Sequence, residues 1–164
     1  MATASLDRPA AGSTVGIARI AALAIPSALL GGALLSQYVG GLHPCEMCYW
    51  QRWPHAAAIA LAALAFLFRA GSRNAKMLTI LAALAIAISG AIGVFHAGVE
   101  YGWWEGLTTC TASGGLSLDE LMNVPLVRCD EVQWSLFGIS LAGWNFLVST
   151  ASALWIFALL RKKG

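Results

Sequence analysis

The chain has 164 residues, of which 59% are hydrophobic and only 11% are charged. A soluble domain carries about 25% charged residues, so this composition indicates a membrane protein. The formal net charge of +2 is too small to indicate a protein that binds nucleic acid. The four cysteines form an even set, and their role depends on which side of the membrane they face.

Four apolar stretches approach the roughly 20 residues that a helix needs to cross a bilayer. They cover residues 17–38, 48–68, 77–99 and 137–160. Alternating strand patterns are absent, and helices satisfy their own backbone hydrogen bonds in lipid. The sequence therefore predicts an all-α membrane protein, with one four-helix transmembrane domain over residues 1–164. The first stretch exceeds the roughly 7–15 residues of a signal-peptide core, so we expect it to remain as a span.

The basic residues predict the orientation of the chain in the membrane. Eight of the ten lysines and arginines lie near the chain ends or between the second and third stretches. These are Arg8, Arg19, Arg69, Arg73, Lys76, Arg161, Lys162 and Lys163. Because cytoplasmic loops are rich in such residues, both termini are predicted to be cytoplasmic. The loops at about residues 39–47 and 100–136 then face outward, together with all four cysteines, which indicates an oxidising compartment.

Two smaller patterns complete the predicted architecture. Ser117 to Glu120 has the form of a capping box, which predicts a short amphipathic helix in the second outer loop. Five glycines within the apolar stretches are expected at close contacts between helices. They are Gly31, Gly32, Gly90, Gly93 and Gly143.

The most informative motif is Cys45-Glu46-Met47-Cys48, followed four residues later by Arg52. On a helix, Cys48 and Arg52 share one face, and a helix that begins near Cys48 would place its sulfur at the N-terminus. Both features favour the reactive thiolate. A redox pair at a membrane surface indicates electron transfer between proteins outside and a molecule dissolved in lipid. Gln51, beside the arginine, is expected to face solvent or lipid head groups.

Four outward cysteines have three interpretations. A Cys-x2-Cys pair is typical of thiol–disulfide exchange, because the second sulfur can resolve the first. Two structural disulfides in a non-catalytic membrane scaffold are the alternative. A zinc site is the third, but Cys110 and Cys129 are 19 residues apart (129 minus 110), which is loose spacing for zinc, so no metal is expected. His96 and Glu100 are four apart and share a helix face.

In this membrane context the chain resembles the DsbB family of bacterial inner-membrane disulfide oxidoreductases. The resemblance covers nearly the whole chain, with four spans, two outer loops and a cysteine pair in each loop. The matching pieces are Pro44-Cys45-Glu46-Met47-Cys48 with Gln51-Arg52, His96-Ala97-Gly98-Val99-Glu100 with Trp103-Trp104, Cys110, Cys129-Asp130, Trp134, Phe137-Gly138 and Trp144-Asn145.

The resemblance implies an enzyme of the inner membrane that reoxidises a periplasmic DsbA-like protein of thioredoxin fold. Its electrons would pass to a membrane quinone, either ubiquinone or menaquinone. Cys45 and Cys48 would be the pair that hands electrons to the quinone, with Cys48 nearest the ring. Arg52 would support quinone binding and the charge on Cys48, and His96 would be a further quinone-site residue.

The same resemblance assigns the second pair to the partner protein. Cys110 would form the mixed disulfide with the DsbA-like protein, and Cys129 would exchange with Cys45.

Overall fold

The computed structural model describes residues 11–106 and 127–161 of the chain. Cys110 and the capping box at 117–120 lie outside the described residues. Four helices make up most of the described chain. Their bounds are Ala11–Tyr38 for α1, Glu46–Ala65 for α2, Arg73–Glu100 for α3 and Leu141–Arg161 for α5.

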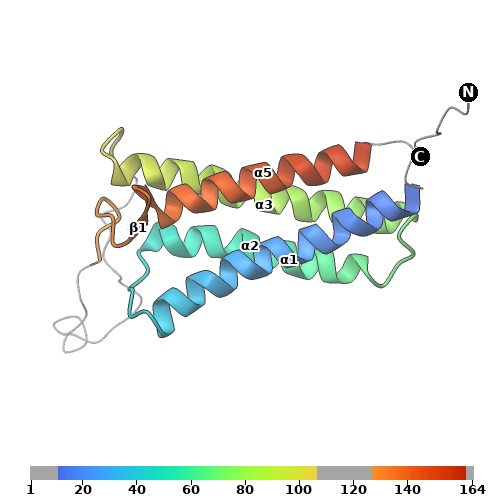
Figure 1. Cartoon of the computed structure of the whole chain (residues 1–164), viewed down its shortest axis with the longest axis horizontal. Helices are drawn as coiled ribbons and strands as arrows, with labels where there is room; N and C mark the ends of the chain where they lie inside the picture. Colours follow the sequence, from blue (N-terminus) through green and yellow to red (C-terminus); the bar gives the residue numbers. More distant parts are fainter. Residues whose placement is uncertain (1–10, 107–126, 162–164) are drawn as a thin grey trace, which may run out of the picture.

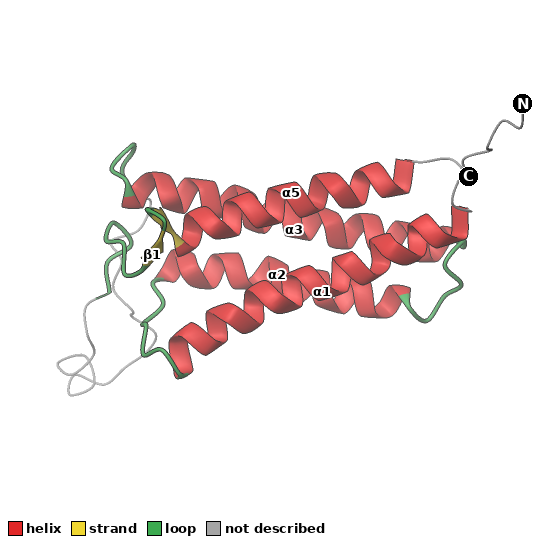
Figure 2. Cartoon of the chain, viewed as in Figure 1, coloured by secondary structure: helices red, strands yellow, loops and turns green. Residues whose placement is uncertain are grey.

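The four helices form an up-and-down antiparallel bundle (Figure 1). Helix α2 packs between α1 and α3, and α5 packs against both α3 and α1, whereas α1 and α3 touch less because they lie diagonally. The bundle is an elongated rod whose loops gather at its two ends, as the secondary-structure view shows (Figure 2). The all-helical architecture of the sequence prediction is therefore confirmed, apart from one small hairpin.

Three of these helices are long and apolar enough to cross a membrane. They are α1 from Thr14 to Tyr38, α3 and α5. Helix α2 has 20 residues and lies alongside them with a more polar first half, which includes Glu46 and Arg52. A chain with such helices is a membrane protein by length and composition. The count of four spans stays a prediction.

Small residues fill the centre of the bundle. Its main buried cluster contains nine alanines, and Ala18, Ala62 and Ala82 have no exposed surface. Such residues let helix backbones approach closely in the way that membrane helices favour. A Cβ added at Gly93 would lie 3.0 Å from the backbone of α5, so this contact confirms one predicted close approach. Gly90 also packs against α5. The near neighbours of Gly143 belong to β2, and no described atom lies within 4 Å of a Cβ at Gly31 or Gly32, so the prediction was wrong for these three.

A two-stranded hairpin precedes α5. Strand β1 (Ser135–Leu136) pairs antiparallel with β2 (Ile139–Ser140). The turn residues Phe137 and Gly138 have φ angles of 54° and 77°, the pattern of a tight hairpin turn with positive φ at both central positions. The predicted helical span at 137–160 was therefore wrong at its start, because a local turn takes up residues that are apolar enough for a helix.

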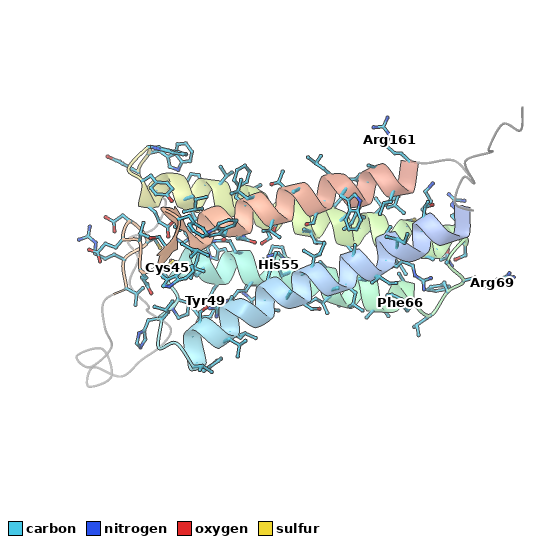
Figure 3. The ribbon with its side chains drawn as sticks, viewed as in Figure 1. Cys45, Tyr49, His55, Phe66, Arg69 and Arg161 are labelled. Carbon is cyan, nitrogen blue, oxygen red and sulfur yellow. The ribbon has the colours of Figure 1, made fainter. Side chains whose placement is uncertain are left out.

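The two ends of the bundle differ in chemistry. Cys45 and Tyr49 lie at one end, whereas Phe66, Arg69 and Arg161 lie at the other (Figure 3). Helix α1 begins and α5 ends at this second end, where the α2–α3 connection also lies (Figure 1). The fold thus places Cys45 and the basic residues Arg69 and Arg161 at opposite ends of the bundle.

Candidate functional site

Cys45 caps helix α2. Its backbone is extended (φ −76°, ψ 173°), and its sulfur accepts a hydrogen bond from the Cys48 N–H at 3.4 Å. The helix thus begins at Glu46, two residues before the predicted start near Cys48, and the sulfur at the helix N-terminus belongs to Cys45. The helical turn between the two residues brings their sulfurs to 3.1 Å from each other.

Both cysteines of this pair are free thiols, and their surroundings differ. Both line a cavity, but Cys45 is only 3% exposed, whereas Cys48 is partly exposed. The pKa of Cys45 is raised well above its usual range, first because its thiol donates a hydrogen bond to Cys48 and second because it is buried. Cys45 therefore holds the proton that the two sulfurs share, and Cys48 carries the negative charge when the pair loses one proton.

Cys129 lies beside this pair. It is disulfide-bonded and 3% exposed. Its side chain belongs to the same buried cluster as Cys45, together with Met47, Val99 and Val127. One sulfur from each predicted pair therefore lies in a single apolar cluster, which is the proximity that exchange between Cys129 and Cys45 needs. Cys110 lies outside the described residues, so its predicted role stays a prediction.

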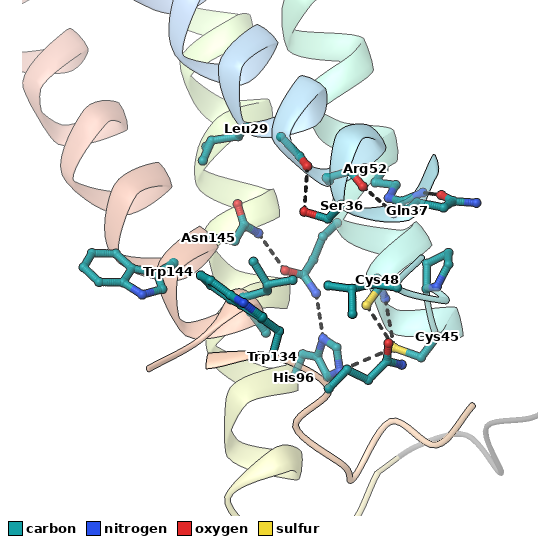
Figure 4. Close-up of a pocket in the computed structure, with 18 of the residues that line it drawn as sticks. Leu29, Ser36, Gln37, Cys45, Cys48, Arg52, His96, Trp134, Trp144 and Asn145 are labelled. Carbon is teal, nitrogen blue, oxygen red and sulfur yellow. Dashed lines mark hydrogen bonds between the residues drawn. The ribbon is translucent and has the colours of Figure 1, made fainter. Parts of the chain in front are cut away.

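A cavity of about 280 Å³ opens beside the cysteine pair (Figure 4). Helix α1 supplies an apolar wall that includes Leu29 and Ala33, and α2 supplies Cys48 and Arg52. Trp134 from the loop before β1 also lines it. Ligand cavities are mostly apolar with a few well-placed polar groups, and this one is close to the lower end of their usual size.

Arg52 points toward α1 at the edge of this cavity. Its guanidinium donates to the side-chain oxygen of Gln37 and, at 3.3 Å, to the backbone carbonyl of Ala33. It also lies 5.1 Å from the centre of the Tyr49 ring, within cation–π range. The arginine shares a wall with Cys48, as the spacing predicts, but its described hydrogen bonds connect α2 to α1.

His96 joins the cysteine pair to the buried interior. Its Nε2 lies 3.5 Å from the Cys45 sulfur and 3.8 Å from Glu100 Oε1, which confirms the predicted shared face of His96 and Glu100. The backbone of Cys129 also forms a hydrogen bond with the His96 ring. One buried carboxylate oxygen, Glu100 Oε2, has no hydrogen-bond partner among the described residues. His96 is 2% exposed, so it is enclosed by the groups that would take part in exchange.

A chain of buried polar side chains continues from His96 into the bundle. Gln51 lies 2.8 Å from His96 Nδ1, and Asn145 of α5 donates to Gln51 Oε1 at 2.7 Å. Asn145 also contacts Ser89 of α3 and His55 of α2. Figure 4 shows the dashed lines that lead from Cys45 through His96 toward Asn145. The expectation that Gln51 faces solvent or head groups was wrong, because it is 7% exposed.

Sequence reasoning missed three members of this chain: His55, Ser89 and Asn145. A signal was present, because an ionisable or amide side chain within an apolar span is a candidate functional residue by default. His55 lies one turn beyond Arg52 on the same helix, so the same rule would have identified it.

The cysteine pair and His96 also have the spacing of a metal site. One ligand atom from each of Cys45, Cys48 and His96 lies within 4.8 Å of the others. Two thiolates and an imidazole form a ligand set that zinc accepts. The expectation that this chain holds no metal stays a prediction.

Comparison with known proteins identifies the family. The family model described as "Disulfide bond formation protein DsbB" matches residues 16–159. The chain belongs to the DsbB family. A Disulfide bond formation protein B from Verminephrobacter eiseniae is 35% identical over 147 residues, covering 82% of this chain and 80% of the relative. One from Burkholderia ambifaria is also 35% identical, over 78% of this chain and 82% of the relative.

A third relative, from Aromatoleum aromaticum, is 26% identical over 86% of this chain and 90% of its own length. No solved structure matches the chain. Membership of the DsbB family establishes a role in disulfide bond formation, and the cysteines described above are the groups with the chemistry for it.

Proposed function

We propose that this protein reoxidises a DsbA-like periplasmic protein of thioredoxin fold and passes the electrons to a membrane quinone. The observation that carries the proposal is the packing of three sulfurs. The free thiols of Cys45 and Cys48 lie 3.1 Å apart, next to the disulfide-bonded Cys129, at the wall of an apolar cavity. A purely structural role does not explain a pair of free thiols that lies between a disulfide-bonded cysteine and a cavity.

The proposed electron route has two exchanges. A thiolate of the reduced partner attacks Cys110, forms a mixed disulfide and releases Cys129 as a thiolate; the partner's second thiol then resolves the mixed disulfide and leaves Cys110 reduced. Cys129 next attacks the Cys45 sulfur of an oxidised Cys45–Cys48 pair, whose S–S bond breaks and leaves the electron pair on Cys48. Cys110 completes the transfer by displacing Cys45 from Cys129. Each exchange moves two electrons and conserves the number of disulfides.

The cavity fits a quinone ring in size and in lining. Its apolar wall suits the ring and an isoprenoid chain, and Arg52 and His96 offer polar groups on the side of the cysteines. When bound, the quinone supplies the acceptor for two electrons and two protons. Cys48 is the more exposed of the two cysteines that line the cavity and carries the negative charge of the pair, so it would be the sulfur that delivers electrons. Arg52 would bind a ring oxygen, and Cys45 would close the disulfide onto Cys48.

The proposed location is the bacterial inner membrane, with both termini cytoplasmic and the cysteines in the periplasm. The separation of Cys45 from Arg69 and Arg161 at opposite ends of the bundle supports this orientation, because basic residues stay on the cytoplasmic side (Figure 3).

The test is a reconstituted reaction. Purified protein is mixed with a reduced DsbA-like partner and either ubiquinone or menaquinone, and quinone reduction is followed by its ultraviolet absorbance. We expect the parent protein to reduce the quinone and the Cys48→Ser variant not to reduce it. If the parent protein neither oxidises the partner nor reduces quinone, the two-disulfide scaffold becomes the better interpretation. Equal rates of quinone reduction in Cys48→Ser would remove the role proposed for Cys48.

A further inference from the structure

Two backbone carbonyls determine the orientation of the buried amides beside the redox pair. The Asn145 side-chain nitrogen lies 3.1 Å from the carbonyl oxygen of Ser89. The Gln51 side-chain nitrogen lies 3.1 Å from the carbonyl oxygen of Met47. A carbonyl oxygen can only accept, so in both amides the group that faces the carbonyl is the NH2. Each orientation is therefore determined by a neighbour that has no alternative role.

These orientations determine where the His96 proton lies. Asn145 donates to Gln51 Oε1 at 2.7 Å, which leaves the Gln51 NH2 facing His96 Nδ1 at 2.8 Å. Since that nitrogen of Gln51 is a donor, His96 Nδ1 must accept. A neutral imidazole has one N–H, so the proton lies on Nε2.

The groups around His96 Nε2 agree with this assignment, because all of them accept. The Cys45 sulfur lies at 3.5 Å and Glu100 Oε1 at 3.8 Å. The Cys45 sulfur thus faces two N–H groups, from His96 and from the Cys48 backbone at 3.4 Å.

We propose that Gln51 and Asn145 are positioning residues that hold His96 with its proton on Nε2. In this form His96 and the Cys48 N–H together stabilise the negative charge that Cys45 and Cys48 share after reduction. The amide chain is thus part of the redox centre, although neither amide touches a sulfur in the described contacts. The redox meaning rests on the proposed function, but the position of the proton does not.

The consequence for the chemistry can be stated bond by bond. When an incoming thiolate opens the Cys45–Cys48 disulfide, one new S–S bond forms, the old one breaks, and the released sulfur keeps the electron pair as a thiolate. The two N–H donors face Cys45, which leaves as a thiolate when Cys110 displaces it, and they favour the reduced pair because hydrogen bonds to charged acceptors are the strong ones. The same proton opposes metal binding at this site, since a ligating nitrogen needs a free lone pair.

The first test measures the proton directly in the parent protein. The chain has three histidines, His43, His55 and His96, so 15N-labelled histidine signals can be assigned with single variants. We expect His96 to carry its proton on Nε2 in the quinone-free, reduced protein in detergent. A signal from an Nδ1 proton, or from a doubly protonated ring at neutral pH, would overturn the proposal. This measurement requires no variant to fold.

The second test changes the amide. Gln51→Met conserves volume but removes the donor to Nδ1, so we expect a second His96 tautomer to appear. His55 is the internal control, since its Nε2 donates to Asn145 Oδ1 at 2.9 Å and should not change. Ser152→Ala is the matched variant, because it removes a buried hydrogen bond of α5 to Ser149 O that lies outside the amide chain.

The redox readout is the oxidised fraction of the Cys45–Cys48 pair in glutathione buffers, measured by alkylation and mass spectrometry without quinone. We expect the equilibrium constant for reduction to fall roughly tenfold in Gln51→Met, the size of one hydrogen bond to a charged group, and to stay unchanged in Ser152→Ala. A Gln51→Met protein that mixes its tautomers but keeps the parent equilibrium would overturn the redox role. A protein that lacks quinone reduction but shows both effects would contradict the proposed function alone.

Discussion

Cys45 and Cys48 are three residues apart but occupy different environments. Cys45 caps a helix and is buried in an apolar cluster that contains Cys129, whereas Cys48 packs against that cluster and is the more exposed of the two cysteines that line the cavity. This asymmetry suits a pair in which one sulfur exchanges with protein and the other serves a ligand.

The division of labour among the sulfurs can be tested by trapping. If Cys110 holds the partner in the mixed disulfide and Cys129 is the thiol of this chain that can displace it, Cys129→Ser should accumulate a covalent complex with the DsbA-like protein, because removal of a resolving thiol preserves the mixed disulfide. Cys110→Ser should form none. Non-reducing gels with a partner that lacks its own resolving cysteine give the readout. Full turnover in both single variants would contradict the relay.

Arg52 is expected to matter more for quinone use than for folding. Arg52→Ala should raise the apparent KM for quinone by roughly tenfold or more, the size of a hydrogen bond from a charged group. Thermal unfolding in detergent should change less, because the lost bonds to α1 are partly exposed. Arg69→Ala, at the opposite end of the bundle, is the control. Unchanged quinone kinetics in Arg52→Ala would remove the role proposed for this side chain.

At the scale of the elements, the end of α3 depends on a glycine. The Trp104 indole folds back over Gly98, donates to the carbonyl of Phe95 at 2.9 Å and stacks on the Phe95 ring. A Cβ at Gly98 would lie 2.0 Å from a ring carbon of Trp104. This contact closes the loop that follows α3, next to the segment that carries His96 and Glu100.

Gly98→Ala should therefore destabilise the protein by about 1–3 kcal/mol, the usual cost of overpacking. Gly31→Ala is the matched variant, since it lies inside α1 with nothing within 4 Å of the added Cβ. It should be neutral or stabilising by up to about 1 kcal/mol, because alanine is the better helix former. Thermal unfolding of the two variants side by side gives the comparison, and equal stabilities would mean that the indole does not pack on Gly98.

The sequence predicted the helices well and their ends less well. Apolar composition located the end of α1 and both ends of α3 to within about one turn, because long apolar runs leave few alternatives in lipid, but it placed the start of α1 at residue 17 instead of Ala11. The start of α5 was missed, since Phe137 is apolar enough for a span and its positive φ depends on the hairpin around it. Cys45 as helix cap was missed because cysteine is not among the usual capping residues.

At the scale of the whole molecule, the ends of the bundle provide a test of orientation. Both cysteine-bearing loops should be periplasmic, because eight of the ten basic residues mark the other side. After mild reduction, a membrane-impermeant thiol reagent should label the cysteines in intact spheroplasts. A control variant with a single cysteine at position 71, in the α2–α3 connection, should be labelled only after lysis. Labelling of the natural cysteines only in inside-out vesicles would overturn the topology.

Sequence motifs identified the cysteines and Arg52, but they did not predict the chain of buried polar side chains. Cys45, Cys48 and Arg52 lie close together in the chain, so spacing alone predicts their proximity. His96, Gln51 and Asn145 come from three helices, and no local pattern shows that they meet. Only the packing of α2 against α3 and of α3 against α5 brings them together. Each was visible as a polar residue in an apolar stretch, but its partner was not.

Arg52 lines the cavity and also donates hydrogen bonds to α1, so a ligand in the cavity would compete with α1 for its N–H groups. An arginine that turns toward a ligand must release Gln37 or the Ala33 carbonyl, while Arg19 still holds the other end of α1 through the Phe68 carbonyl at 2.9 Å. We therefore expect Gln37→Ala to bind quinone roughly three- to tenfold more tightly while unfolding at a lower temperature. Arg52→Ala should weaken both properties. Binding titrations and thermal unfolding of the two variants give the comparison. Tighter quinone binding in Gln37→Ala would show that the bonds of Arg52 to α1 compete with the ligand, whereas unchanged binding would mean that Arg52 only stabilises α1.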